Sequence, residues 1–364
     1  MNYDYLIVGA GFFGATFARQ LTDAGKKCLV IDSRDHIGGN AYTERVGEID
    51  VHLYGPHIFH TNDEKIWKYV NRFTKFKDFI LSPKVYRDGR MYSLPFNMNT
   101  FHEIWGVTTP KAAQLVIENQ RFKGVPTNLE EQALSLVGRD IYELLIKDYT
   151  TKQWQKDPKE LPAFIIKRLP LRFTYDNNYF NDKYQGIPIG GYTKMFQNML
   201  HGIEVRLGCN YFDHREEWNK LAKKVVFTGK IDEFYGYQFG ELEYRTLKFE
   251  HQTISDSDNF QGVAQVNYPD PGCAWTRIIE HKHFNSAKTD YTIITKEIPD
   301  TWDKTKIPYY PINDDRNDEL YRKYRELADQ ESDVIFGGRL TEYRYYDMHQ
   351  VIASALMVSK KELL

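Results

Sequence analysis

The sequence predicts an α/β fold: a Rossmann-like nucleotide-binding domain with a parallel sheet, plus an inserted helical domain and an antiparallel β-sheet domain. Three observations predict it. A glycine motif separates an apolar run from a helical stretch near the N-terminus, residues 100–149 show helical periodicity, and residues 245–298 alternate as strands do. At 364 residues the chain exceeds one ordinary core, so we expect two or three domains.

The first forty residues carry the nucleotide-binding signal, in the order strand, glycine motif, helix, strand, acid. The parts are Tyr5–Val8, Gly9–Gly14, residues 15–24, Cys28–Ile31 and Asp32. Gly9 permits a tight turn, Gly11 lets the backbone approach a pyrophosphate, and Gly14 lets helix and strand pack closely. The helix N-terminus offers N–H groups to phosphates, and Asp32 can accept hydrogen bonds from ribose. The motif predicts a bound dinucleotide; the alternative is a glycine-rich turn that binds nothing.

Two further features favour a flavin over a nicotinamide. The pair Gly38–Gly39 follows the second strand, and a glycine turn there lets an extended cofactor continue past its pyrophosphate. The end of the chain repeats the opening device, with Val334–Phe336, Gly337–Gly338 and a helix from about residue 349 to 364 that Asp347 is placed to cap. A cofactor site built by both ends of one chain is typical of flavoproteins.

Composition excludes several other classes of function. The net charge of −2 predicts neither a nucleic-acid surface nor an anionic-membrane surface. Three widely spaced cysteines give no disulfide framework, which fits a reducing cytoplasm. The chain opens directly into a strand and has no apolar run near the roughly 18 residues that span a bilayer, so we expect neither signal peptide nor membrane span. The 15% aromatic content favours a nucleotide or carbohydrate site.

The remaining segments divide among helices, strands and turns. We expect helices over 62–80, 127–137, 193–200 and 317–330, a hairpin over 83–96, a strand of the parallel sheet at 225–229 and a rigid aromatic turn at 308–311. Thr127 and Glu130 predict a capping box. His57 and His60 share a turn, but no further His, Cys or acid completes a metal site, so we expect no metal and a turn lying against the cofactor.

Ten short segments, spread along nearly the whole chain, together form a recognisable set of motifs. They are Gly9–Gly11, His36–Asn40, Tyr54–Thr61, Lys152–Trp154, Lys167–Pro170, Asp176–Phe180, Tyr244–Arg245, Thr276–Ile278, Tyr309–Pro311 and Gly338–Leu340. In these segments the chain resembles UDP-galactopyranose mutase of the bacterial type. One departure is Trp275, which stands where a Tyr or similar residue is expected.

The resemblance implies an isomerase that interconverts UDP-galactopyranose and UDP-galactofuranose, the donor of galactofuranose for cell-surface glycans. It implies non-covalent FAD, active when reduced, whose N5 attacks the anomeric carbon and displaces UDP without net redox change. An electron donor for the FAD and a homodimer are also implied. Such chemistry accounts for a sequence that shows no Ser/His/Asp set, no acid pair and no metal cluster.

The resemblance also assigns site residues. Arg168, Arg277 and His60 are implied as catalytic, and arginines suit a diphosphate because they stay ionised and engage two oxygens. The implied substrate contacts are Tyr149, Thr150, Trp154, Arg168, Tyr179, Asn267, Arg277, Tyr310 and Tyr345. The implied cofactor contacts are Gly9, Gly11, Phe13, Gly14, Asp32, Ser33, Gly39, Asn40, His57, Ile58, Gly338, Arg339, Asp347, Met348, His349, Gln350, Val351, Ile352 and Ala353.

We expect three units along this chain. The FAD-binding domain comprises 1–80, 190–242 and 318–364; the helical domain is 97–165 with an adjoining mobile loop 166–182; the substrate sheet comprises 81–96, 183–189 and 243–317. Two functions of other classes stay open. One is an FAD-dependent oxidase of the amine-oxidase kind, which shares the glycine fingerprint, and the other is a nucleotide-sugar-binding protein without catalysis.

Overall fold

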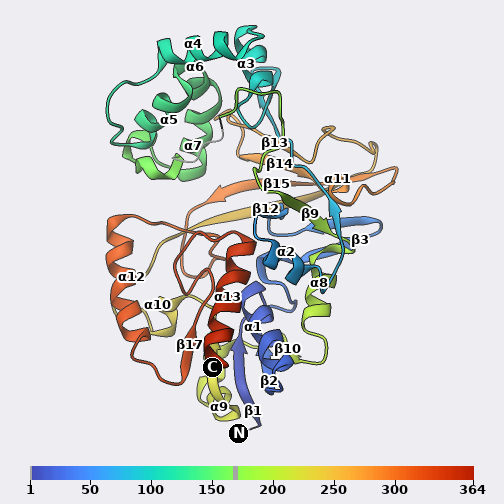
Figure 1. Ribbon diagram of the computed structural model, residues 1–364, viewed down its shortest axis with the longest axis vertical. Coiled ribbons are helices and arrows are strands. Elements are labelled where there is room, and N and C mark those ends of the chain that lie inside the picture. Colours follow the sequence, from blue (N-terminus) through green and yellow to red (C-terminus); the bar gives the residue numbers. More distant parts are fainter. Residues whose placement is uncertain (1, 167–170) are drawn as a thin grey trace.

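The computed structural model describes residues 2–166 and 171–364. Arg168, predicted to be catalytic, and its neighbours Lys167, Leu169 and Pro170 lie outside the described residues. Figure 1 shows three levels: a helix-covered parallel sheet at the end that holds both termini, a large sheet in the middle, and a group of helices at the opposite end. Within the described residues, no helix is both long enough and apolar enough to cross a bilayer.

The first level is a five-stranded parallel sheet in the order β10-β2-β1-β11-β17. Its strands are β1 (Tyr3–Val8), β2 (Cys28–Ile31), β10 (Glu204–Arg206), β11 (Ala222–Phe227) and β17 (Val334–Phe336). The central strands are largely apolar on both faces, as expected for a sheet covered by helices on each side. The predicted Rossmann-like parallel sheet is therefore confirmed, and the C-terminal part of the chain supplies one edge strand.

Helices cover both faces of this sheet. On one face α1 (Phe12–Asp23) packs beside α13 (Met348–Glu362), and α2 (Glu64–Val70) and α8 (Gly191–Met199) complete the same hydrophobic core. The other face carries α9 (Arg215–Leu221) and α10 (Ile231–Phe234), and α12 (Asp315–Ala328) packs against α10. Because α1 follows β1 directly, its N-terminus lies at the carboxyl edge of the sheet, where ligands of such folds bind.

The second level is a seven-stranded sheet in the order β16-β12-β15-β14-β13-β7-β8. Its strands are β7 (Lys84–Arg87), β8 (Arg90–Ser93), β12 (Tyr244–Ile254), β13 (Gln265–Asn267), β14 (Arg277–Glu280), β15 (Thr292–Asp300) and β16 (Tyr310–Pro311). Every pairing is antiparallel except that of β7 with β13, which confirms the predicted antiparallel sheet. Asn267 pairs with Arg277, so two predicted substrate residues lie side by side.

The third level is a group of helices with a core of its own. It contains α3 (Met98–Trp105), α4 (Pro110–Gln120), α5 (Leu129–Val137), α6 (Arg139–Ile141), a π-helical segment (Tyr142–Ile146) and α7 (Lys147–Trp154). The last three run as one continuous rod. A π-helical segment holds an extra residue relative to the α-helix and is often found at functional sites.

Smaller pieces connect the levels. They are the hairpin of β3 (Thr43–Val46) with β4 (Ile49–His52), a three-stranded sheet of β5 (Phe59–Thr61), β9 (Tyr184–Pro188) and β6 (Phe76–Asp78), and the short α11 (Lys282–Asn285). The helix expected over 62–80 is only partly right, because it ends at Val70 and the chain then forms β6. Trp67 lies within α2 as predicted, whereas Phe73 lies in the turn after it, and pairing with β9 begins at Phe76.

Two local predictions are wrong in detail. The N-cap of α5 is Asn128, whose side chain accepts a hydrogen bond from the Glu131 N–H at 3.0 Å, and not Thr127. Glu131 instead accepts from Thr127, so the cap moves by one residue. The aromatic turn expected at 308–311 ends as β16, because Tyr310 pairs with Arg245 at the edge of β12.

Candidate active site

The glycine motif forms a turn between β1 and α1 that larger residues could not form. Gly9 has φ +112°, and a Cβ atom there would lie 2.0 Å from Oγ1 of Thr228. A Cβ atom at Gly14 would lie 1.9 Å from the carbonyl oxygen of Gly9. At Gly11 the nearest atom to a Cβ would be Cα of Gly39, at 4.0 Å, so protein packing alone does not require glycine there. This open space fits the pyrophosphate of a dinucleotide, and no side chain caps α1.

Asp32 stands at the end of β2, beside this turn. Its Oδ2 accepts a hydrogen bond from the Ala10 N–H at 2.8 Å, and its Oδ1 accepts from the Arg34 N–H at 2.9 Å. Arg34 in turn donates from Nη2 to Oδ1 of Asn40 at 2.8 Å, while Ser33 is exposed. Each carboxylate oxygen keeps a further lone pair, so a fixed Asp32 can still accept from ribose hydroxyls.

The C-terminal part of the chain closes the other side of the cradle. Gly338 has φ +96°, and a Cβ atom there would lie 3.2 Å from Cβ of Phe13, so these two predicted cofactor residues are in contact. Asp347 directly precedes α13 as its N-cap residue, and its N–H donates to Oε1 of Gln350 at 2.8 Å. Of the residues predicted farther along this helix, Val351 and Ile352 are buried in the core and Ala353 is exposed.

A cavity of about 630 Å³ lies between the helical group and the large sheet. The predicted substrate residues that line it are Tyr149, Thr150, Trp154, Tyr179, Asn267, Tyr310 and Tyr345. They come from α7, β13, β16, the segment 171–182 and the stretch before α13. A cavity of 300–1,000 Å³ is of the size that holds a nucleotide-sized ligand. The structure thus brings together residues that lie almost 200 positions apart in the sequence.

Arg277 lies beside this cavity in a buried ion pair. Its Nε and Nη2 both lie 2.8 Å from Oε2 of Glu297, which is 3% exposed. Burial alone lowers the pKa of Arg277, but the Glu297 carboxylate outweighs burial and raises it, with help from Tyr149 and Tyr310. Arg277 therefore stays charged, and Glu297 fixes the direction of its guanidinium plane.

The tyrosines provide neutral hydrogen-bond donors around this cation. Burial raises the pKa of Tyr149, so its hydroxyl keeps its proton at neutral pH. Tyr310 and Tyr345 stack with centroids 5.0 Å apart, and the guanidinium carbon of Arg339 lies 5.1 Å from each ring. Tyr345 leaves 59% of its surface accessible, so a ligand can reach it. Arg339, next to the Gly338 turn, thus connects the cradle with the cavity.

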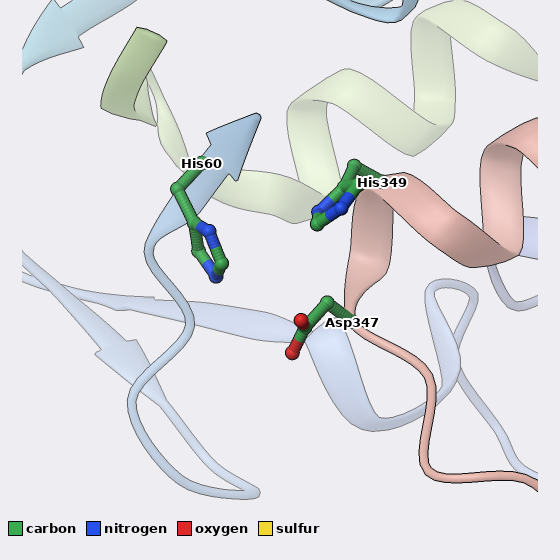
Figure 2. Close-up of side chains that lie close together, drawn as sticks. All are labelled: His60, Asp347 and His349. Atoms are coloured by element: carbon green, nitrogen blue, oxygen red, sulfur yellow. The ribbon is translucent and has the colours of Figure 1, made fainter. Parts of the chain in front are cut away.

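His60 belongs to a cluster of polar side chains at the start of α13. Figure 2 shows His60, from β5, facing Asp347 and His349 at the N-terminus of that helix. The donor atoms of the three lie within 4.8 Å of one another. Nδ1 of His60 contacts Oδ2 of Asp182 at 2.6 Å, and its ring stacks on Phe180 with centroids 3.9 Å apart.

This cluster can hold a polar group. Nδ1 of His349 is buried without a hydrogen-bond partner among the described residues. Three protein ligands can bind a metal ion, although structural zinc sites use four. No metal was predicted from the sequence, because Asp347 and His349 lie almost 300 positions after His60 in the chain. Their place beside the predicted cofactor contacts of α13 suits a polar edge of a flavin equally well.

His57 lies at the junction of cradle and cavity. Its backbone N–H donates to Nδ1 of His52 at 3.0 Å, and its own Nδ1 lies 2.7 Å from the Gly55 carbonyl. Burial lowers the pKa of His57 to about 4; the Gly55 carbonyl opposes this, and the charges of Arg339 and Arg277 add to it. His57 is therefore neutral at physiological pH. Ile58, the next residue, is buried in the core beneath it.

Three residues of the site were not found from the sequence. Glu297 and Asp182 orient Arg277 and His60, and each lies in a strand or loop whose pattern gave no sign of a partner. Arg245 lines the cavity, its guanidinium carbon 5.1 Å from the Trp154 ring and its Nη2 donating to the Trp154 carbonyl. It forms no ion pair with any described residue. Arg245 stands in one of the segments that carry the resemblance, which is the signal that could have found it.

Comparison with known proteins begins from the fold. Residues 7–73 match the model of an NAD(P)-binding Rossmann-like domain. A crystal structure of reduced UDP-galactopyranose mutase covers 99% of this chain with 95% of its own length, TM-score 0.73 and 13% identity, and a putrescine oxidase structure covers 99% with TM-score 0.57. Fold and cradle together define a protein with a Rossmann-like nucleotide-binding domain.

The sequence comparisons identify the family. Residues 144–345 match the model of UDP-galactopyranose mutase, which spans more than half of the chain. A dTDP-fucopyranose mutase of Escherichia coli is 42% identical over 96% of this chain and 96% of its own, and a probable UDP-galactopyranose mutase of Klebsiella pneumoniae is 41% identical over 100% and 95%. The chain belongs to the UDP-galactopyranose mutase family, and it is an enzyme of the isomerase class.

Proposed function

We propose that this enzyme interconverts UDP-galactopyranose and UDP-galactofuranose, with FAD bound non-covalently in the glycine cradle and active when reduced. One observation carries the proposal. Arg339 leaves the cradle at Gly338 and packs on Tyr310 and Tyr345, which line the cavity. A cofactor on one side of this guanidinium and a nucleotide sugar on the other would meet there.

The residues of the cavity suit the departure of a diphosphate. When bound and reduced, FAD supplies a nucleophile, its N5, for the anomeric carbon of the sugar. Arg277, held by Glu297, faces negative charge as it develops on the leaving diphosphate. The hydroxyls of Tyr310 and Tyr345 donate hydrogen bonds to phosphate oxygens. On the basis of the resemblance alone, we propose that Arg168 also balances the negative charge of the leaving diphosphate and belongs to a mobile loop over residues 166–182.

The cradle residues suit FAD. The backbone at Gly11 and the N-terminus of α1 receive the pyrophosphate, and Asp32 receives a ribose. The start of α13 carries a partial positive charge that would favour a polar, electron-rich part of bound FAD. His60, oriented by Asp182, and the neutral His57 would supply further polar contacts to it.

A second candidate substrate pair is dTDP-fucopyranose and its furanose isomer. The E. coli enzyme named for dTDP-fucopyranose is as similar to this chain as the K. pneumoniae relative named for UDP-galactopyranose. The two substrates differ by a hydroxyl on the ribose, a methyl on the base and a hydroxyl on the sugar. Those groups lie outside the reacting bonds, so the same chemistry serves both.

One anaerobic assay tests these proposals. Purified holoenzyme, oxidised or reduced with dithionite, is incubated with UDP-galactofuranose or dTDP-fucofuranose, while flavin absorbance and product are followed. We expect conversion to the pyranose with reduced enzyme, little with oxidised enzyme and no net flavin oxidation. Substrate-driven flavin reduction would identify an oxidase instead, and binding without either change would identify a nucleotide-sugar-binding protein.

The cellular setting extends the proposal. We infer a cytoplasmic homodimer that receives electrons from a cellular reductant and supplies galactofuranose for cell-surface glycans. The three cysteines are free, which fits a reducing compartment. The three levels of the fold support the proposed division into FAD-binding, helical and substrate units.

A further inference from the structure

Lys152 is enclosed by a loop of the large sheet. Its Nζ lies within hydrogen-bonding distance of four backbone carbonyl oxygens, those of Tyr268 (2.6 Å), Asp270 (2.8 Å), Trp275 (2.9 Å) and Cys273 (3.1 Å). Sγ of Cys273 follows at 3.3 Å. An ammonium group has three N–H donors, so five acceptors exceed its hydrogen-bonding capacity. The loop surrounds this charge as carbonyl oxygens surround a metal cation.

The other lysine of the same helix behaves differently. Lys147, also on α7, makes an ordinary ion pair with Glu143 at 3.3 Å, with both side chains more than 40% exposed. Lys152 has no acidic partner among the described residues and is half-buried instead. Without Lys152, four carbonyl oxygens of one loop would point at each other, and mutual repulsion would open the loop.

The enclosing loop joins two strands of the cavity wall. Residues 268–276 connect β13 to β14, so the loop starts and ends next to the paired residues Asn267 and Arg277. The Tyr268 N–H donates to the Thr276 carbonyl at 2.7 Å. Because this hydrogen bond joins the two ends of the loop, a shift of the loop would move both strands.

Lys152 itself stands in the opposite wall. On α7 it lies between Thr150 and Trp154, which line the cavity with Tyr149. The two walls come from residues more than 100 positions apart, and Lys152 makes five contacts between them.

We propose that Lys152 is a positioning residue that sets the separation between α7 and the β13–β14 hairpin. It thereby holds Trp154 at the distance from Arg277 that the nucleotide diphosphate needs. The effect on turnover rests on the function proposed above; the effect on nucleotide binding and on the loop does not.

The test compares four variants of the flavin-loaded, full-length enzyme: Lys152→Met, Lys152→Arg, Lys152→Ala and the control Lys147→Met. Lys152→Met keeps the length of the side chain and removes its charge. Lys152→Arg keeps the charge but carries it on a planar guanidinium group. The N–H groups of that plane cannot all point at the carbonyl oxygens that surround a single ammonium nitrogen. Lys147→Met is the matched control on the same helix. Calorimetry gives the affinity for UDP and dTDP, and hydrogen exchange reports on residues 268–275.

We expect Lys152→Met to weaken UDP or dTDP binding at least tenfold and to raise KM more than it lowers kcat. Exchange in 268–275 should speed up, with flavin content and melting temperature unchanged. Lys152→Arg should fall between, and Lys147→Met should match the wild type. Methylammonium ions should restore part of the binding to Lys152→Ala, because they refill the same ring of carbonyls.

Two outcomes overturn the proposal. Wild-type affinity and wild-type exchange in Lys152→Met would show that the loop holds without the ammonium. Loss of flavin or of the folded state in that variant would show a general structural role in place of positioning. A wild-type enzyme inactive on both sugars would refute the proposed function, while nucleotide affinity and exchange would still decide the role of Lys152.

Discussion

The cofactor cradle and the substrate cavity are built in different ways. The cradle is made of backbone: glycines whose missing side chains leave room, the ends of helices, and one carboxylate fixed by two N–H groups. The cavity is made of side chains from many separate elements, among them α7, β12, β13 and β16. A backbone site tolerates no added atoms, whereas a side-chain site depends on charge and hydroxyl groups. Substitutions should therefore fail in different ways in the two regions.

The largest expected effect is in the cavity. Arg277→Ala removes the cation that we propose to face the diphosphate, and it leaves Glu297 buried and unpaired. We expect turnover to fall on the order of 10²–10³, as when one charge-stabilising donor is lost, with FAD still bound. Steady-state kinetics and the flavin spectrum measure the two quantities. The isosteric Glu297→Gln should cost less, since it keeps a hydrogen-bond acceptor; near-normal turnover in Arg277→Ala would contradict the role given to this residue.

The next effect belongs to the cradle and separates its glycines from one another. Gly11→Ala adds a methyl group where the protein leaves space, so the chain should fold and lose flavin affinity on the order of a hundredfold. Gly14→Ala drives its methyl group into the Gly9 carbonyl and should lower the melting temperature of the apoprotein as well. Flavin titration and thermal unfolding of both variants check this. Equal stability losses would refute the distinction.

A smaller effect is expected for one hydroxyl of the cavity. Tyr345→Phe keeps the ring stacked on Tyr310 and removes a single donor to phosphate. A hydrogen bond to a charged group contributes about 1.5 kcal/mol, or roughly tenfold in kcat/KM. Tyr346→Phe serves as the control, because its hydroxyl is occupied by Glu342. An equal loss in the control would assign the effect to local packing.

The last effect concerns the stability of the fold and not turnover, and it comes from a buried histidine. Burial, with the neighbouring His251, lowers the pKa of His281 to about 3, and Glu280 opposes this; His281 also faces His52 and Thr295. Between pH 3 and the unfolded value of about 6.5, the unfolded chain binds a proton that the folded chain does not. Stability should therefore fall as pH falls from about 6.5, at up to about 1.4 kcal/mol per pH unit for this residue.

Urea unfolding at pH 5, 6 and 7 measures that slope. His281→Gln should flatten it by up to one proton, and the substitution of the exposed His201 by Gln should leave it unchanged. An unchanged slope in His281→Gln would show that other groups account for the acid sensitivity.

The two regions were also unequally visible in the sequence. The strand, the glycines and Asp32 lie within forty residues and obey local spacing rules, so the cradle could be predicted from the residues themselves. The cavity could be predicted only through the family resemblance, because Tyr149, Asn267 and Tyr345 meet through tertiary folding. Glu297 and Asp182 were missed because no spacing rule in the sequence indicates which acid will pair with a given arginine or histidine. Local errors had local causes, such as the competition of Asn128 with Thr127 for one helix cap.

The π-helical segment Tyr142–Ile146 sets the rotational phase of the rod that carries the cavity wall. Each residue of an α-helix turns the chain by about 100°, so an extra residue turns everything after it by that angle. Tyr149, Thr150 and Trp154 all follow the insertion. A one-residue deletion here would make a more regular helix and aim those side chains away from the ligand. The orientation of the cavity-lining face of α7 is thus determined by an irregularity that precedes it in the chain.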